Sequence, residues 1–194
     1  MRRPAREAGT ILPLAVAAML VLFSVLAFSV DQAVAYAAKA RQENVLDEMR
    51  ASCMEPSTAL EARGSSDPGS VIASRAVEAA RSEGFEGSVR VWFYEVPEAQ
   101  VAQARRVWGI GLQIEEDVPT VLARGFGIPS ISAASHRTVV AEPYAGERVW
   151  RPDRTPCGRF EVGPRQDQKM FYQMGSIDEF PDEMAREIAA ALGR

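Results

Sequence analysis

The sequence predicts an α+β protein in which a long N-terminal transmembrane helix precedes a small domain with an antiparallel β-sheet and flanking helices. Three observations predict this arrangement. Residues 8–30 carry no charge, three later segments alternate apolar and polar residues with the period of a strand, and helical patterns lie on either side of those segments. Grouped strands with helices towards the ends favour α+β over an alternating α/β fold.

The uncharged run contains 23 residues and is long enough to cross a membrane. As a helix it would measure about 34 Å, against about 30 Å for a hydrocarbon core. A cleavable signal peptide is the alternative, but its apolar region typically has only about 7 to 15 residues. Here the chain continues beyond Asp31 through residues 32–55 without Gly or Pro. We therefore interpret residues 9–30 as an uncleaved transmembrane helix.

Basic residues predict the orientation of this span. Arg2, Arg3 and Arg6 precede it, whereas the first basic residue after it is Lys39. The positive-inside bias then places the N-terminus in the cytoplasm and the C-terminal domain outside the cell membrane. The expected organisation is a cytoplasmic N-terminus (1–8), a transmembrane helix (9–30), an exported continuation of the helix (31–55) and an exported α+β domain (56–194).

The composition of the exported part argues against nucleic acid as a partner. The whole chain has 22 basic and 26 acidic residues and is 47% hydrophobic. The part from residue 32 onward keeps 19 basic and 24 acidic residues, a net charge of −5. An acidic domain without a basic run does not attract a phosphate backbone.

The first helix is expected over residues 14–53. Beyond the span, four apolar residues recur at spacings of four, seven and four, which places them on one helical face: Val34, Ala38, Val45 and Met49. This stripe predicts a packing surface, directed either at the chain's own domain or at a neighbouring helix.

The remaining elements follow from turn residues and periodicity. Pro56 and the Gly/Ser/Pro-rich stretch 64–70 predict a connector, after which Ser70 caps a helix that stops at Gly84. A final helix, capped by Ser176 or Asp178, has apolar residues four apart: Phe180, Met184, Ile188 and Leu192. Three strands are predicted over 88–96, 106–115 and 130–142, with weaker candidates over 147–150, 159–162 and 170–174.

The two cysteines, Cys53 and Cys157, both lie on the predicted exported side, where thiols can stay oxidised. A disulfide between them is expected, and two free buried thiols are the alternative. A native bond requires Cα atoms within about 7 Å of each other.

Candidate chemistry is sparse, and no catalytic, cofactor-binding or metal-binding residue is predicted. A Ser-His-Asp or Cys-His mechanism would need His136, the one histidine, which lies in an alternating strand pattern. A single histidine without Cys-x-x-Cys spacing does not predict a metal site. The segment 124–129 has part of a phosphate-loop pattern but is better explained as a turn.

The N-terminal region resembles the TadE/TadG-like proteins of Tad (Flp) pilus assembly systems. Gly9 opens the apolar span, Val30 and Asp31 close it, and further polar residues follow in the family's order: Tyr36, Lys39, Arg41, Asn44 and Asp47. The resemblance covers residues 9–53 most firmly and implies a membrane-anchored minor pilin or pseudopilin-like subunit. Its implied partners are the membrane and other pilin-like subunits or pilus assembly proteins.

Two further expectations follow. Asp31, directly after the span, is expected to be an interfacial acid in contact with water, because a carboxylate inside the membrane is costly. The alternative to an assembly subunit is a signal-anchored exported enzyme or ligand-binding domain, which a polar pocket containing His136 would favour.

Overall fold

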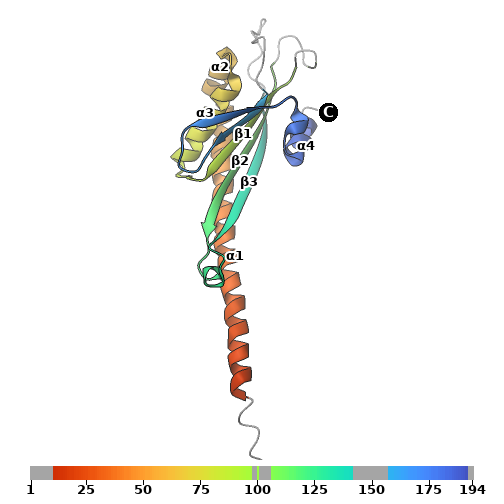
Figure 1. Ribbon diagram of the computed structural model, residues 1–194. Helices are drawn as coiled ribbons and strands as arrows, with labels where there is room; N and C mark the ends of the chain where they lie inside the picture. Colours follow the sequence, from red (N-terminus) through yellow and green to blue (C-terminus); the bar gives the residue numbers. More distant parts are fainter. Residues whose placement is uncertain (1–10, 98–99, 101–105, 142–156, 192–194) are drawn as a thin grey trace, which may run out of the picture. The chain divides into compact units, whose positions relative to one another are not determined.

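The computed structural model describes residues 11–97, 100, 106–141 and 157–191. The chain divides into two compact units. Unit 1 comprises Met1–Ala38 and Asp117–Ser132, and unit 2 comprises Lys39–Glu116 and Ala133–Arg194. The α+β fold class, with a long apolar N-terminal helix and an antiparallel sheet, is confirmed (Figure 1).

The first helix, α1, runs from Ile11 to Met54, close to the predicted bounds. Two details after it differ from the predictions. Pro56 begins a second helix, α2 (Pro56–Gly64), because proline lacks only an N–H that the first turn leaves unpaired anyway. Helix α3 (Pro68–Ser82) is capped by Asp67, whose carboxylate accepts from the backbone N–H of Ser70 at 3.0 Å; Ser70 itself lies inside the helix.

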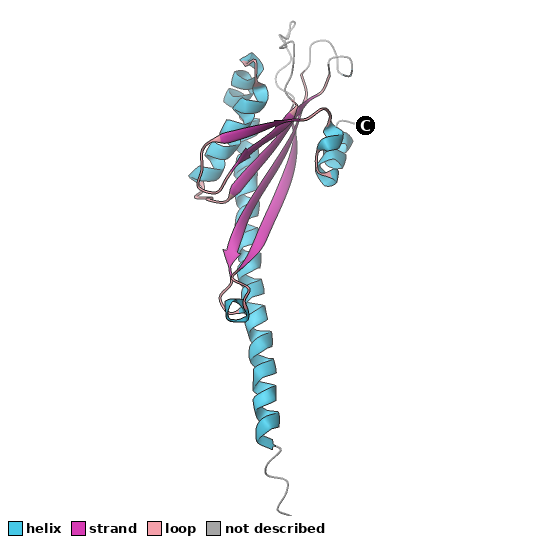
Figure 2. Ribbon diagram, in the orientation of Figure 1, coloured by secondary structure: helices cyan, strands magenta, loops and turns pink. Residues whose placement is uncertain are grey.

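Five strands form one sheet in the order β3-β2-β1-β4-β5 (Figure 2). The three predicted strands are confirmed, and the two weaker candidates near residues 159–162 and 170–174 are also strands. Strand β2 continues four residues beyond its predicted end. The bounds are β1 Ser88–Glu95, β2 Trp108–Pro119, β3 Ser130–Ala141, β4 Gly158–Val162 and β5 Lys169–Gln173.

In unit 2 the two faces of the sheet bury different apolar clusters. One face packs against the second half of α1 and against α2 and α3, with β1 contributing Val89, Val91 and Phe93. The other face packs against α4 (Asp182–Ala191), with Trp92 of β1 beside Met184. Alternation along β1 therefore distributes its side chains between two cores.

The face of β2 towards α4 carries glycines because the helix lies very close to it. A methyl group at Gly109 would lie 2.5 Å from Ile188 Cγ2, and one at Gly111 would lie 2.7 Å from Met184 Sδ. The alternate positions of β2 face the first core with large side chains, including Trp108 and Ile110. The pattern of large and small residues in β2 thus fits one face for each core.

A buried ion pair connects Glu95, the last residue of β1, to Arg106, which lies just before β2. Arg106 donates to both carboxylate oxygens of Glu95, at 2.7 and 2.6 Å, and both side chains are only 1% exposed. Arg106 also donates to the carbonyl of Arg63 at 3.0 Å and lies 5.4 Å from the centre of the Trp108 ring. The guanidinium of Arg106 therefore contacts a carboxylate, a backbone carbonyl and an aromatic ring.

The last part of the chain matches the predicted helix only in part. Ser176 caps the short 3-10 helix η3 (Ile177–Glu179), and α4 begins after it. Phe180, Met184 and Ile188 are buried together as the spacing predicted. The predicted strand over 147–150 and the positions Leu192, Gly193 and Gly9 lie outside the described residues.

Candidate functional site

The first half of α1 is an apolar surface that the described residues leave largely uncovered. Its side chains include Leu12, Leu20, Phe23 and Phe28, each more than half exposed. By length and composition this is one helix able to cross a membrane, and only 6% of its most apolar stretch is buried. A core helix of a water-soluble domain would be mostly buried, so this surface requires an apolar environment of another kind.

Asp31, the first charged residue after this surface, binds the connection between β2 and β3. Its Oδ1 accepts from the backbone N–H groups of Val121 at 2.6 Å and Leu122 at 3.2 Å, and its Oδ2 accepts from that of Ala123 at 2.6 Å. These N–H groups precede or begin the 3-10 helix η2 (Ala123–Phe126) and would otherwise lack partners. Asp31 thus caps η2 from a distant part of the chain.

The surroundings of Asp31 correct the expectation that its carboxylate contacts water, because the residue is only 3% exposed. Burial raises the pKa of this carboxyl, and the three backbone N–H groups lower it by more, so that the pKa lies below its ordinary value. The described partners of Asp31 are backbone N–H groups and not a cation. Periodicity along α1 could not reveal them, since they come from residues 90 positions away.

Gln42 is a second buried polar contact of α1 that sequence reasoning missed. It is fully buried in unit 2 and donates to the Ala133 carbonyl at 3.0 Å and to Glu116 at 3.2 Å. Its Oε1 accepts from Ser135 Oγ at 2.9 Å. A polar residue between the apolar positions of the helix stripe was the available signal. Gln42 therefore aligns α1 with β2 and β3 through side-chain hydrogen bonds.

The residues that carry the family resemblance separate into two groups. Arg41 pairs with Glu116 at 2.5 Å and Asp47 pairs with Arg137 at 2.7 Å, so these two face strands of the chain's own sheet. Tyr36 is 72% exposed and Asn44 is exposed. The second group is therefore accessible on the surface of α1.

The predicted packing stripe also divides. Val45 and Met49 are buried in the first core of unit 2, whereas Val34 and Ala38, in unit 1, are partly buried. Of the two partners left open for this stripe, the chain's own domain covers the C-terminal half.

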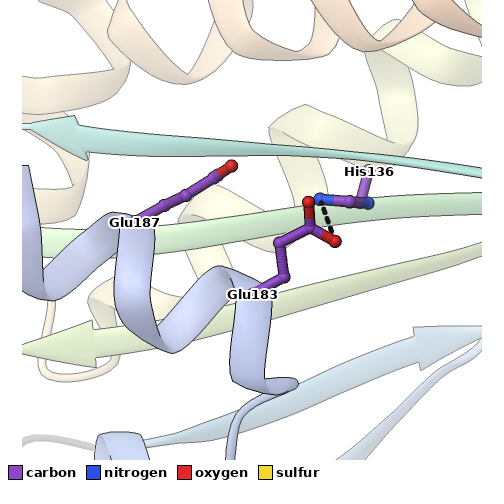
Figure 3. A group of neighbouring side chains, drawn as sticks. All are labelled: His136, Glu183 and Glu187. Atoms are coloured by element: carbon purple, nitrogen blue, oxygen red, sulfur yellow. Dashed lines mark ion pairs between the residues drawn. The ribbon is translucent and has the colours of Figure 1, made fainter.

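His136 lies on β3 beside two acids of α4 (Figure 3). Its Nε2 is 3.5 Å from Glu183 Oε2, and the ligand atoms of His136, Glu183 and Glu187 lie within 4.8 Å of one another. These residue types could bind a divalent cation. In the described structure Glu183 faces His136 and Glu187 accepts from Thr138 at 2.6 Å, so the same groups connect α4 to β3.

A shallow groove of about 330 Å³ lies elsewhere in unit 2, between α3 and the end of the β4–β5 connection. It is lined by Ser74, Val77, Glu78, Arg81, Asp167 and Lys169. Its cations are directed at the protein itself, because Arg81 donates to the carbonyls of Phe85 and Gly87 and Lys169 donates to Ser70 and Ser74. His136 is not among the lining residues, so this groove does not match the pocket expected of the enzyme alternative.

The predicted disulfide is wrong. Cys53 and Cys157 are both free thiols. Cys53 belongs to the core beneath α1 and α3, and Cys157 packs against the α4 core on the other face of the sheet. The predicted shared compartment and the presence of two cysteines gave no information on which side of the sheet each thiol would lie.

We expect both thiols to react slowly in the folded protein. Burial raises the pKa of Cys53 to about 12, and burial together with the charge of Glu179 raises that of Cys157 to about 11. At pH 7.5 iodoacetamide should therefore modify either thiol more than about 100-fold more slowly than an unfolded thiol of pKa about 8.5, because the thiolate reacts. Unfolding without reductant should yield two adducts by mass spectrometry. Adducts that appear only after reduction would show a disulfide.

Comparisons with known proteins return no relative: no protein-family model, no curated protein and no solved structure matches this chain.

Proposed function

We propose that this protein is a non-enzymatic, single-pass membrane subunit of a Tad/Flp-type pilus assembly system, similar to TadE/TadG-like minor pilins. The observation that carries the proposal is that the two halves of α1 have different surroundings. Its apolar half is uncovered, while its polar half contributes Val45 and Met49 to the core of unit 2. One helix thus supplies both the membrane anchor and a structural element of the domain.

The accessible part of the helix supports a role in contacts with other subunits. Tyr36 and Asn44 belong to the pattern that resembles the family, yet both side chains are exposed and neither is needed to fill the core of unit 2. An exposed tyrosine near a membrane boundary combines apolar area with a polar tip, which suits contact with a neighbouring helix or subunit. The basic N-terminal flank supports a cytoplasmic N-terminus and an extracytoplasmic unit 2.

A photocrosslinking experiment tests this assignment. The crosslinking amino acid p-benzoylphenylalanine replaces Tyr36 in the full-length protein, in cells that produce the pilus. We expect light-dependent adducts that mass spectrometry identifies as pilin-like subunits or pilus assembly proteins. The same probe at Leu60, an exposed apolar residue of α2, is the matched control. It should give at least about threefold less adduct, because the residues that contact a partner cover only a small part of a protein surface.

Deletion of the gene provides the second measurement. The assignment expects surface pili to be lost or reduced and restored by the wild-type gene. Normal pili in the deletion strain, together with no pilus-protein adduct at Tyr36, would contradict the proposal.

A further inference from the structure

The connection between β2 and β3, residues 120–129, has an unusual surface for a loop. We name it the hairpin tip. Four of its ten residues are large apolar side chains that are between 41% and 72% exposed: Val121, Leu122, Phe126 and Ile128. Arg124 is its one charged residue. Loops exposed to water are typically polar, so an ordered apolar tip indicates a surface that contacts something apolar.

Most backbone N–H groups of the hairpin tip have hydrogen-bond partners, either within the tip or at Asp31. The N–H of Thr120 donates to the Pro129 carbonyl at 3.1 Å, Gly127 donates to Arg124 at 3.1 Å, and Ile128 donates to Ala123 at 3.2 Å. The positive φ of Gly127 (85°) permits the turn that closes η2. The N–H groups of residues 121–123 are satisfied by Asp31. Paired backbone groups remove the main cost of moving a loop out of water.

Asp31 determines the position of the hairpin tip along the apolar helix within unit 1. Its carboxylate binds three consecutive N–H groups of the tip, and it directly follows the uncharged segment. Ala27, one helical turn earlier, is only 8% exposed, whereas its neighbours Leu26 and Phe28 are more than half exposed. The helix face that carries Asp31 is therefore covered as far as Ala27, which lies about 6 Å along the helix axis from Asp31 at 1.5 Å per residue. Figure 1 shows the turn that contains η2 beside α1, to which the hydrogen bonds of Asp31 connect it.

From this geometry we infer that the hairpin tip inserts into the membrane leaflet at the Val30 end of the span. The occupant of its apolar surface is lipid. Its exposed apolar side chains continue the uncovered apolar surface of α1, and amphipathic elements of this kind lie about 5 to 10 Å deep at the boundary of headgroups and acyl chains. Arg124 can remain at the headgroup level. The inference rests on the membrane anchoring in the proposed function and not on the pilus assembly role.

This insertion assigns a role to Asp31 that the helix alone does not reveal. The tip and the span are connected by hydrogen bonds at the carboxylate, so the protein would contact the leaflet at two places instead of one. The tilt and rotation of a membrane helix depend on its packing contacts and interfacial anchors, and a second inserted element restricts both motions. The consequence is a defined orientation of unit 1 relative to the membrane plane.

Depth-dependent fluorescence quenching tests the inference on the full chain. The protein, with Phe126→Cys labelled by the fluorophore NBD, is reconstituted as one copy per nanodisc of phosphatidylcholine and phosphatidylglycerol. Because Cys53 is buried and Cys157 is partly buried, the introduced thiol at exposed position 126 is labelled preferentially, and the unsubstituted protein measures residual labelling. Leu60→Cys is the matched control, since Leu60 is an equally apolar, exposed residue of unit 2. Phe23→Cys reports on the span.

Insertion predicts that lipids with a spin label at acyl carbon 5 quench the label at position 126 at least about threefold more than the label at position 60. Aqueous iodide should show the reverse preference. Asp31→Ala should reduce lipid quenching at position 126 and leave it unchanged at position 23, because the span remains apolar.

Three results would overturn the inference. Quenching of the label at position 126 by iodide as strong as at position 60 would place the tip in water. Protection from both iodide and lipid quenchers would mean that protein covers the tip. If the label at position 23 is itself not quenched by lipid, the membrane anchoring fails and the inference fails with it. A failure confined to position 126 would leave the anchoring and the assembly role intact.

Discussion

Replacement of Arg106 by Met is expected to destabilise unit 2 by about 3 to 5 kcal/mol, because it removes one partner of a buried ion pair, the guanidinium that binds both carboxylate oxygens of Glu95. The measurement is urea unfolding of the full-length protein in detergent, followed by tryptophan fluorescence. Trp108 is buried and close to Arg106, so its emission reports on this region.

The exposed pair Arg165–Glu86 is the matched control. Its two charged groups lie 2.7 Å apart but are 80% and 64% exposed. Arg165→Met should cost less than about 1 kcal/mol. The double variant Arg106→Met, Glu95→Leu should recover most of the stability lost in the single variant, since apolar residues of similar size replace buried ion pairs well. Equal small losses at Arg106 and Arg165 would contradict the burial of the first pair.

The second large effect is expected from Val45→Glu. Val45 is 2% exposed in the first core of unit 2, so the substitution buries a carboxylate among apolar side chains. We expect a loss of about 4 kcal/mol or more in the free energy of unfolding at pH 8. Burial raises the pKa of the introduced carboxyl in the folded state, so the destabilisation should be smallest below its unfolded pKa near 4.3 and grow as pH rises.

Asn44→Glu is a close control for this variant, because it introduces the same carboxylate one residue earlier at an exposed position. It should change stability by less than about 0.5 kcal/mol. A stable Val45→Glu protein would contradict the observed packing of α1 on the sheet. The comparison also separates two causes of a defect in the proposed pilus assembly role, since Val45→Glu destabilises the folded domain whereas Asn44→Glu changes an accessible surface of α1.

Packing of Val45 and Met49 in the core changes how the helix stripe is interpreted. Their spacing predicted a packing surface without identifying the partner, because a partner on the same chain and one on another chain select for the same apolar residues. The structure assigns this half of the stripe to the chain's own domain. The proposed contacts with other subunits are therefore better examined at Tyr36 and Asn44 than at the buried positions.

Local pattern alone determined most of the secondary structure. The uncharged run predicted a span-length helix, and period-two alternation predicted the strands over 88–96 and 130–142 to within one or two residues, because these signals depend on neighbouring residues. Pro56 was misjudged because proline ends one helix and begins another equally well, and only the structure shows which residue lies at N1.

Only the tertiary structure decided which distant groups meet. Cys53 and Cys157 lie against opposite faces of the sheet, and Asp31 binds backbone groups near residue 122. Neither fact can be read from neighbouring residues. The residues around a cysteine do not show which face of the sheet its thiol will contact. The groups that bind Asp31 are backbone N–H groups, which every residue except proline has. The chain thus encodes its helices and strands through nearest neighbours, whereas its cap at η2 and its separated thiols arise from the way the sheet and α1 pack.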